Sequence, residues 1–338
     1  MRKVLLVLMA FTVCGLWAIG QQKPVIGVFI STLKNPYFVT LAEGAQAAGK
    51  KFGVEVVIYD AQDDAALQLR QVEDALAAGI KAICINPVHA EAVIPAVEKA
   101  NAAGVPVFSV DRDVLGGVRV CYIGTSNVLA AEQGAATLIR YLALAKRPLP
   151  WRIVILEGIP GASAAIEREQ GFKNVFDPLI KGGAIKVVAD LTAYFDRAQG
   201  YRVMADILAT TKDIDAVIAA NDEMILGALE AIKAAGLKVG FPDGIILMGF
   251  DAIDDAVNAV RSGELVGTIA QAPFIQGYWG VEAAYRYLVE GWRPPAGTPI
   301  YPPTGALFIP TPIAVVTAEN VEQVAAITRT PPVLPGTK

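Results

Sequence analysis

The feature that most constrains the fold of this chain is a regular alternation between short apolar runs and amphipathic segments. The alternation starts at Lys23, gives five units, and resumes after a proline-rich stretch at 147–150 to give five more. The ten predicted strands are 25–31, 54–60, 82–86, 105–111, 118–124, 152–158, 185–191, 216–221, 245–251 and 265–271. Strands that are apolar at nearly every residue are buried on both faces, as in parallel sheets covered by helices. The pattern therefore predicts an α/β fold with two similar doubly wound parallel-sheet lobes in tandem.

The segments between the predicted strands have the apolar periodicity of helices that pack one face against a sheet. They cover 38–52, 67–78, 91–103, 127–144, 197–208, 223–235 and 274–290. Asn35-Pro36 places a capping residue before a proline suited to a first helical turn. After Gly291 the chain becomes rich in proline and then offers one more apolar run at 313–317. Periodicity alone leaves open which lobe this run joins.

The first twenty residues have the pattern of a cleaved export signal. Arg2 and Lys3 form a positive region, 4–17 is a short apolar run, and 18–20 supplies small residues before Gln21. A membrane anchor is the alternative, but the run is shorter than the ~20 residues that a spanning helix needs. We therefore expect a signal peptide at 1–20 and a mature protein that is periplasmic or otherwise extracytoplasmic.

Charge and cysteine content narrow the class of protein further. The net charge is −4 and the sequence has no cluster of lysine and arginine, so it predicts no binding of nucleic acid or of an anionic membrane surface. Cys84 and Cys121 lie in runs that a doubly wound order separates by one strand, which is too far for a disulfide. We expect two buried free thiols.

Signatures of catalysis are missing from the sequence. The single histidine, His89, follows Pro87-Val88 at a predicted helix start, where a surface or capping role is the usual one. The sequence around Ser163 lacks the second glycine of a nucleophile elbow. There is no G-x-G dinucleotide fingerprint, no Gly-Lys-Ser/Thr phosphate loop and no Cys/His cluster. The sequence therefore predicts a protein that is not an enzyme and that needs no metal or cofactor.

Four predicted strands end on a side chain that can bind a hydroxyl group, namely Asn86, Asp111, Asn221 and Asp251. Open α/β sheets bind ligands at the carboxyl ends of their strands, and a carboxylate can accept hydrogen bonds from two hydroxyl groups. Each residue could instead cap the following helix; at Asn221 we expect Asp222 to supply that cap. Two such residues in each half predict a cleft for one small polyhydroxylated molecule.

Aromatic side chains lie close to these positions in the sequence. Tyr37 and Phe38 follow the first strand, Phe195 precedes a helix, and Phe250 adjoins Asp251. A sugar ring packs its C–H face on an aromatic ring while its rim needs polar partners. Packing in the core is the alternative explanation for each of them.

Taken in order, these residues resemble the type I periplasmic sugar-binding proteins of ABC transporters, and most closely the members that bind ribose. The resemblance runs from about 24 to 316 and rests on STLKNPYF (31–38), INP (85–87), VDR (110–112), FDR (195–197), NDEM (221–224), GFD (249–251) and TIAQ (268–271). It implies sugar contacts at Ser31, Asn35, Tyr37, Phe38, Asn86, Asp111, Arg112, Arg168, Phe195, Asn221, Phe250, Asp251 and Gln271. Without the resemblance, Arg168 has the pattern of an exposed helical arginine.

The resemblance also implies how the chain is divided. It predicts an N-terminal lobe of 24–124 plus about 273–309 and a C-terminal lobe of 126–271 plus about 311–330, joined by three crossings. Three features depart from the ribose binders. Tyr37 stands where they commonly have phenylalanine, Ser126 replaces an acidic residue near the first crossing, and the tail from Pro294 is longer.

The function implied is that of a monomeric receptor that captures one monosaccharide and presents it to the permease of an ABC transporter or to a chemoreceptor. A pentose such as ribose fits best, because a hexose needs room that is normally made by a smaller aromatic, and Phe38, Phe195 and Phe250 keep their size. A hexose, inositol or another polyol is the first alternative. A secreted α/β hydrolase is a more distant one.

Overall fold

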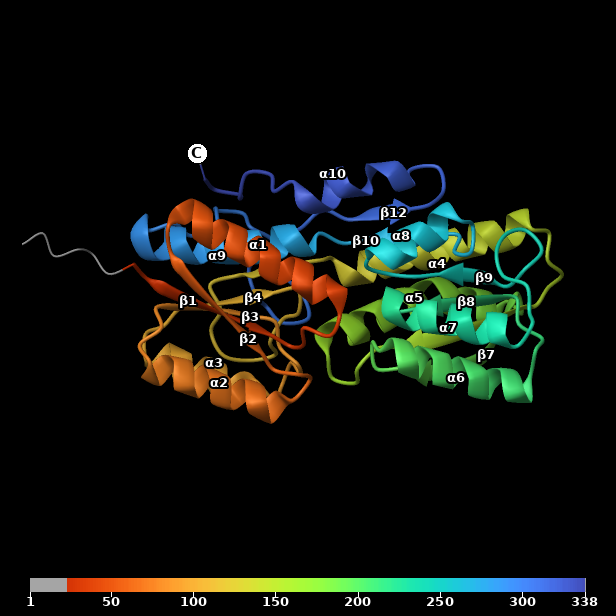
Figure 1. The fold of residues 1–338 in the computed structure, drawn as a ribbon, viewed down its shortest axis with the longest axis horizontal. Helices are drawn as coiled ribbons and strands as arrows, with labels where there is room; N and C mark the ends of the chain where they lie inside the picture. Colours follow the sequence, from red (N-terminus) through yellow and green to blue (C-terminus); the bar gives the residue numbers. More distant parts are fainter. Residues whose placement is uncertain (1–22, 338) are drawn as a thin grey trace, which may run out of the picture.

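The computed structural model describes residues 23–337, except for the side chains of residues 325–327. Figure 1 shows an elongated molecule in which two sheets lie side by side along the long axis, each covered by helices. The signal peptide predicted at residues 1–20 lies outside the described residues. Among the residues that are described, no helix is long and apolar enough to cross a membrane.

The first sheet is parallel throughout and has six strands in the order β11-β5-β4-β3-β1-β2. Its strands are β1 (Val25–Ile30), β2 (Glu55–Asp60), β3 (Ala82–Ile85), β4 (Val107–Val110), β5 (Tyr122–Gly124) and β11 (Phe308–Pro310). The central strands β3 and β4 are buried at every residue, as their unbroken apolar runs predict. One face is covered by α1 (Pro36–Phe52) and α9 (Pro273–Val289), the other by α2 (Ala65–Ala77) and α3 (Ile94–Ala102).

The second sheet repeats this strand order further along the chain. Four parallel strands in the order β7-β6-β8-β9 comprise β6 (Trp151–Glu157), β7 (Ile185–Thr192), β8 (Ala216–Ala219) and β9 (Ile246–Met248). Two isolated parallel bridges join the edge of the sheet at β9 to the segment that contains β10 (Thr268–Ala270). Strand β10 in turn pairs antiparallel with β12 (Ala314–Val316). Its helices are α4 (Asn127–Leu144), α5 (Ser163–Lys181), α6 (Arg197–Thr210), α7 (Asp222–Ala234) and α8 (Asp254–Arg261). The two halves are thus built alike.

The predicted architecture of two parallel sheets is confirmed, and each of the ten predicted strands is present. Most are shorter than predicted, whereas β6 begins one residue earlier, at Trp151, and β7 ends one residue later, at Thr192. The apolar run at 313–317 contains β12 and pairs with β10. The sequence analysis did not identify α5, α8 or β11. Cys84 and Cys121 are buried free thiols, as expected.

The start of α1 is fixed by its own sequence. The Asn35 side-chain oxygen accepts a hydrogen bond from the Tyr37 backbone N–H at 2.9 Å, and Pro36 occupies the first turn. The helix ends at Gly53, whose φ of 68° is the left-handed conformation that glycine tolerates. Because Asn35 caps the start of α1, Tyr37 and Phe38 lie just beyond the carboxyl end of β1.

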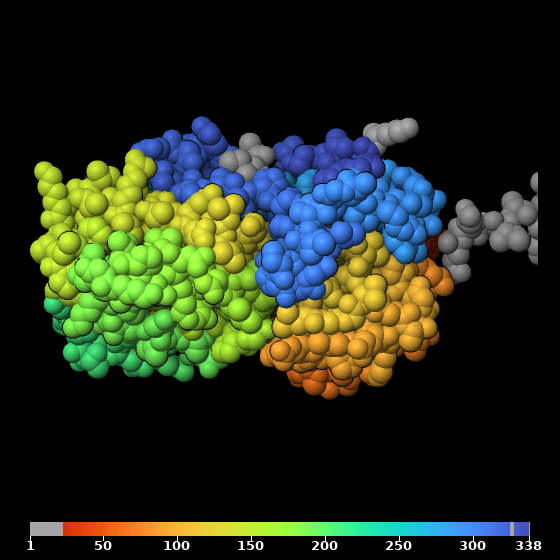
Figure 2. All heavy atoms as spheres, turned by 180° about the vertical axis from the view of Figure 1, so that it is seen from behind, coloured from red at the N-terminus to blue at the C-terminus, as the bar shows by residue number. Residues whose placement is uncertain are grey.

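The segment after α9 returns to the first half of the molecule by way of the second. After β12 it forms η1 (Val321–Gln323) and α10 (Val324–Arg329), and α10 contacts α9. The indole N–H groups of Trp279 and Trp292 then donate to the carbonyl oxygens of Pro332 at 3.0 Å and Pro335 at 3.2 Å. Leu334 is fully buried there. In Figure 2 the blue residues that follow α9 lie over the junction between the two halves.

Helices α1 and α9 approach closely because glycine lies at their contact. A β carbon on Gly277 would lie 1.9 Å from the backbone oxygen of Leu41, and one on Gly44 would lie 2.0 Å from that of Phe274. Neither neighbour can move without displacing a helix backbone. These two positions therefore exclude any side chain.

We expect Gly277→Ala to lower the free energy of unfolding by about 1–3 kcal/mol, because the added methyl group forces α1 and α9 apart. Urea unfolding followed by circular dichroism measures the change. Gly182→Ala is the matched control, since its β carbon would lie 3.3 Å from the nearest atom; we expect it to change stability by at most about 1 kcal/mol. Equal effects of the two substitutions would contradict this account of the helix contact.

Candidate functional site

A small pocket lies where the carboxyl ends of strands from both sheets face each other. It is lined by Asn35, Tyr37, Phe38, Asp111, Arg112, Ala164, Arg168, Phe195, Asn221, Asp251 and Gln271. These include every predicted contact residue except Ser31, Asn86 and Phe250, which lie directly behind the lining. The free volume is only about 20 Å³, so the side chains of the two walls nearly fill the space between them.

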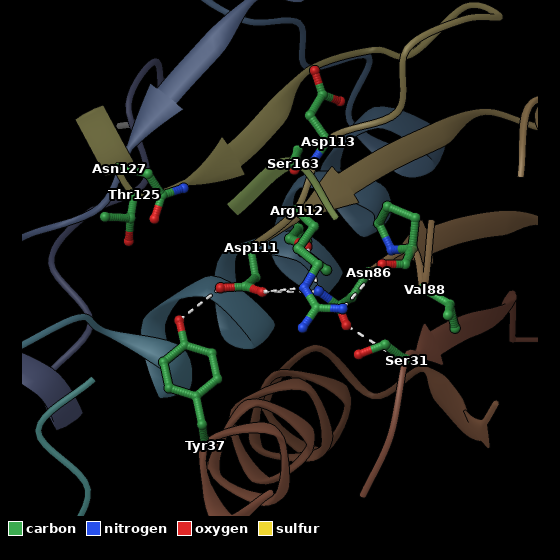
Figure 3. Close-up of polar contacts among 12 residues, drawn as sticks. Ser31, Tyr37, Asn86, Val88, Asp111, Arg112, Asp113, Thr125, Asn127 and Ser163 are labelled. Carbon is green, nitrogen blue, oxygen red and sulfur yellow. Dashed lines mark hydrogen bonds and ion pairs between the residues drawn. The ribbon is translucent and has the colours of Figure 1, made fainter. Parts of the chain in front are cut away.

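Ser31 and Asn86 support the first wall from behind. The Asn86 side-chain oxygen accepts from the Ser31 backbone N–H at 3.1 Å, and its Nδ2 donates to Oδ2 of Asp111 at 2.9 Å. Figure 3 shows Asn86 between Ser31 and Asp111, with the Arg112 guanidinium beside them. Asn86 is fully buried, so it orients the Asp111 carboxylate within the protein.

Three residues of the site hold a backbone conformation that side chains disfavour. Asp111, Phe195 and Asp251 have φ angles of 61°, 57° and 122°. Such strain is kept only where the surrounding structure enforces it, and it is concentrated at functional sites. Here it turns each side chain out of its strand end or loop and into the pocket.

Arg168 lines the pocket and is only 4% exposed. The resemblance therefore placed it correctly, whereas its sequence pattern alone indicated an exposed helical arginine. Its Nη1 donates to the Ala220 carbonyl oxygen at 2.6 Å, and its Nε donates to the Asn127 side-chain oxygen at 3.0 Å. Nη1 also lies 3.5 Å from Oδ1 of Asp251. The guanidinium carbon sits 3.8 Å from the centre of the Phe250 ring, so Phe250 supports Arg168 from behind.

Asn221 caps its own helix, which corrects the expectation that Asp222 does so. The Asn221 side-chain oxygen accepts from the Met224 backbone N–H at 3.0 Å, and Nδ2 donates to the Phe195 carbonyl oxygen at 3.3 Å. Asp222 instead accepts from the Ile253 N–H and from the Thr268 hydroxyl. Asn221 still lines the pocket, and each end of its amide keeps one further bonding position beyond these two bonds.

Arg112 joins the two walls through their aromatic rings. Its guanidinium carbon lies 5.1 Å from the centre of the Phe38 ring and 5.4 Å from that of Phe195. Its Nη1 donates to the Pro87 carbonyl oxygen at 3.4 Å. Within the described residues its buried Nε has no hydrogen-bond partner, so this guanidinium has donors to spare for a ligand.

The pocket balances two carboxylates against two guanidinium groups. Burial raises the pKa of Asp251 to about 7, while the nearby charge of Arg168 counteracts that rise. Burial also raises the pKa of Asp111, and Arg112 and Arg168 oppose it. With both carboxylates ionised these four groups carry no net charge, so the arrangement suits a neutral molecule rich in hydroxyl groups.

Three buried residues next to the pocket were missed by the sequence analysis, namely Gln276, Thr125 and Thr311. The Tyr37 hydroxyl lies 2.8 Å from Oε1 of Gln276, and the Gln276 Nε2 donates to the hydroxyl oxygens of Thr125 at 3.2 Å and Thr311 at 3.3 Å. Thr125 also donates to Oε1 of Gln271 at 2.6 Å. The sequence offered one signal for this cluster. Gln276 is a polar residue on the mainly apolar face that α9 buries, and it is itself fully buried.

A wider groove of about 640 Å³ adjoins the pocket at Tyr37, Asp251 and Gln271. It runs along α8 and past 321–329 rather than between the strand ends of the two sheets. The smaller pocket is the better candidate site, because the buried charges of both walls converge on it.

The residues that a hydrolase would need are engaged elsewhere. The Ser163 hydroxyl oxygen accepts from the Asp113 backbone N–H at 3.0 Å. Nδ1 of His89 accepts from the backbone N–H groups of Glu91 and Ala92. These lie in a turn before α3 begins, so His89 bonds to the turn and does not cap the helix. Neither side chain is positioned as a nucleophile with its base.

A second polar cluster joins the segment after α9 to α5 beside the site. The Tyr301 hydroxyl donates to Oε2 of Glu167, and Asn127 Nδ2 donates to the same oxygen at 2.8 Å. The Thr304 hydroxyl similarly donates to Asp113. Burial raises the pKa of Glu167 to about 7, although the bonds from Tyr301 and Asn127 lower it in part.

We expect Glu167→Gln to change how stability depends on pH. Because its pKa lies above the ordinary value of 4.5, Glu167 stabilises the fold fully below pH 4.5, and this contribution is lost as the pH rises through about 7. The unfolding free energy of wild type relative to the variant should therefore fall between pH 5 and pH 8. Urea unfolding at several pH values measures it, with Glu98→Gln at an exposed position as control. A constant difference would contradict the raised pKa.

Comparison with known proteins gives consistent matches over most of the chain. A family model described as a periplasmic binding protein domain matches residues 26–291. The ribose import binding protein RbsB of Bacillus subtilis is 40% identical over 78% of this chain and 82% of its own length. The D-apiose import binding protein of Paraburkholderia graminis is 32% identical over 80% of this chain and 83% of its own.

Solved structures match the whole arrangement of both halves. A galactofuranose binding protein superposes with a TM-score of 0.79 at 25% identity, covering 90% of this chain and 99% of its own. The Caulobacter myo-inositol binding protein, bound to myo-inositol, superposes with a TM-score of 0.75 at 29% identity, covering 93% and 99%. The described fold is therefore the one these binding proteins share.

Proposed function

The chain belongs to the type I periplasmic binding proteins, and we propose that it captures a pentose such as ribose between its two halves. Like its family, it is a binding component of a sugar import system and not an enzyme. The observation that carries the proposal is the meeting of Asp111 and Arg112 from one wall with Arg168 and Asp251 from the other around one small pocket.

The open bonding positions of the pocket match hydroxyl groups. Asp251 offers Oδ2, which accepts no hydrogen bond from the described residues, while Arg112 offers its unpaired Nε. A sugar hydroxyl can donate to the first and accept from the second, and hydrogen bonds to charged groups contribute about 1.5–3 kcal/mol each. Phe38 and Phe195 supply the apolar surface for the ring.

A pentose is favoured over larger sugars for two reasons. The relatives named for ribose reach 40% identity across about four-fifths of this chain. The full-size rings of Phe38, Phe195 and Phe250 leave less room for the extra hydroxymethyl group of a hexose than smaller side chains would. A hexose, inositol or another polyol is the second candidate, because the similar structures include a galactofuranose binding protein and a myo-inositol binding protein.

In this proposal the ligand closes the cleft because it binds both walls at once. The lobes are 24–124 with about 273–309 and 126–271 with about 311–330. The chain crosses between them near 124–126, 271–273 and 310–312, and its last described residues return to the first lobe, where Trp279 and Trp292 bond Pro332 and Pro335. A ligand favours whichever state it contacts more fully, which here is the closed one. The closed monomer then presents its sugar to the permease of an ABC transporter, and a chemoreceptor is a second partner for the same surface.

We expect Asp111→Ala and Asp251→Ala each to weaken binding of the best sugar at least about tenfold, because each change leaves polar groups unpaired in a desolvated pocket. Calorimetric titration measures affinity, and circular dichroism checks the fold. Asp177→Ala, at an exposed position on α5, is the matched control and should bind as wild type does. If either pocket variant bound within threefold of wild type, the site assignment would be wrong.

We expect ribose to raise the melting temperature more than xylose, arabinose, glucose, galactose, allose or inositol, because a ligand that binds only the folded state stabilises it. EDTA should leave the shift unchanged, and light scattering should show a monomer. A shift with a hexose or inositol and none with any pentose would overturn the choice of sugar. Loss of the shift in EDTA would overturn metal-free binding.

A further inference from the structure

The Tyr37 hydroxyl points into the polar floor of the pocket and is not exposed to solvent. It lies 2.9 Å from Oδ1 of Asp111, 3.1 Å from Oε1 of Gln271 and 2.8 Å from Oε1 of Gln276. A hydroxyl group has one proton to donate, and an ionised carboxylate is the strongest of these acceptors. The proton therefore goes to Asp111, along the contact drawn between the two residues in Figure 3.

This bond makes the two carboxylates of the pocket unequal. Asp111 accepts from Tyr37 at Oδ1 and from Asn86 at Oδ2, so both of its oxygens have a protein partner. Asp251 accepts from Gln271 at Oδ1 at 2.6 Å, while no described residue donates to its Oδ2. Oδ2 of Asp251 is thus open to a ligand, whereas both carboxylate oxygens of Asp111 already accept a hydrogen bond from the protein.

The hydroxyl is held in place and cannot swing aside for a ligand. Tyr37 is 3% exposed, lies in the capped first turn of α1, and packs edge-on against Phe38 with ring centres 5.2 Å apart. Gln276, which contacts the hydroxyl, is itself bonded to Thr125 and Thr311. Displacing the tyrosine would break several buried hydrogen bonds.

We propose that Tyr37 is a specificity-determining residue whose hydroxyl takes the position on Asp111 Oδ1 that a sugar hydroxyl would otherwise occupy. The inference rests on the proposed function and narrows its ligand class. The pocket accepts a pentose-sized sugar that presents its hydroxyl groups to Asp251, and it tolerates a deoxy sugar that lacks the hydroxyl facing Asp111. Gln276 is a positioning residue that keeps the tyrosine hydroxyl in register.

The experiment is a double-mutant cycle in which one hydroxyl is removed from the protein and one from the ligand. Wild type and Tyr37→Phe are titrated by calorimetry with D-ribose and with its monodeoxy analogues, including 2-deoxyribose and 3-deoxyribose. In wild type the analogue that lacks the hydroxyl facing Asp111 should lose little affinity. In Tyr37→Phe the same analogue leaves Asp111 Oδ1 unpaired, so the ratio of its Kd to that of ribose should rise about fivefold to a hundredfold.

Two further variants identify the cause of such a change. Tyr278→Phe removes the same oxygen on α9, where the ring packs near Phe52 and Phe274 and lies outside the pocket lining, and it should leave every ratio unchanged. Gln276→Leu removes a residue that holds the Tyr37 hydroxyl in place, so it should raise the same ratio, but by less than Tyr37→Phe does. An unchanged ratio in Gln276→Leu would overturn the positioning role of Gln276.

The same titrations separate this inference from the proposed function. Equal ratios in wild type and Tyr37→Phe, within twofold for every analogue, would overturn the role of Tyr37 while ribose binding by wild type left the receptor function standing. If wild type bound none of the sugars of the melting panel, the proposed function and this inference would both be wrong.

Discussion

Charge pairing across the pocket is the constraint on which the arrangement of both halves depends. Asp111 and Asp251 are each less than a tenth exposed, and a buried carboxylate is costly unless it is paired and hydrogen-bonded. Arg112 and Arg168 supply the pairing, and both guanidinium groups rest on aromatic rings. The strand ends, the strained backbone at Asp111 and Asp251, and the buried Asn86 all act to hold these four groups in position.

Sequence alone predicted the strands well, because a strand buried on both faces leaves an unbroken apolar run. It predicted the helix α5 poorly, since that helix is polar along much of its length and its buried residues include Glu167 and Arg168. Nothing local distinguishes such an arginine from an exposed one; only the position of α5 against the pocket decides it. The expectation that Asp222 caps α7 was wrong for a related reason. Two adjacent residues could supply the cap, and the choice depends on Ile253 and Thr268 from distant segments, which Asp222 bonds instead.

Polar residues connect the pocket to the segments that join the two halves. Gln276 contacts Tyr37 at the pocket and the hydroxyl groups of Thr125 and Thr311, which lie in two of the segments that pass between the halves. Thr125 also bonds Gln271 in the third. One or two hydrogen bonds through the buried side chains of Gln276 and Gln271 therefore connect the pocket floor to these three segments.

The return of the chain to α9 has a practical consequence for measuring the proposed closure of the cleft. The described part begins beside β1 and ends where Trp279 and Trp292 hold Pro332 and Pro335, so both ends belong to the same half, as Figure 1 shows. A fluorophore pair at the two ends would keep a fixed separation whatever the other half does. Immobilisation through residue 337 leaves α6 and α7 free, and the separation between a dye on α6 and one at that end would shorten or lengthen if the halves close on the ligand as proposed.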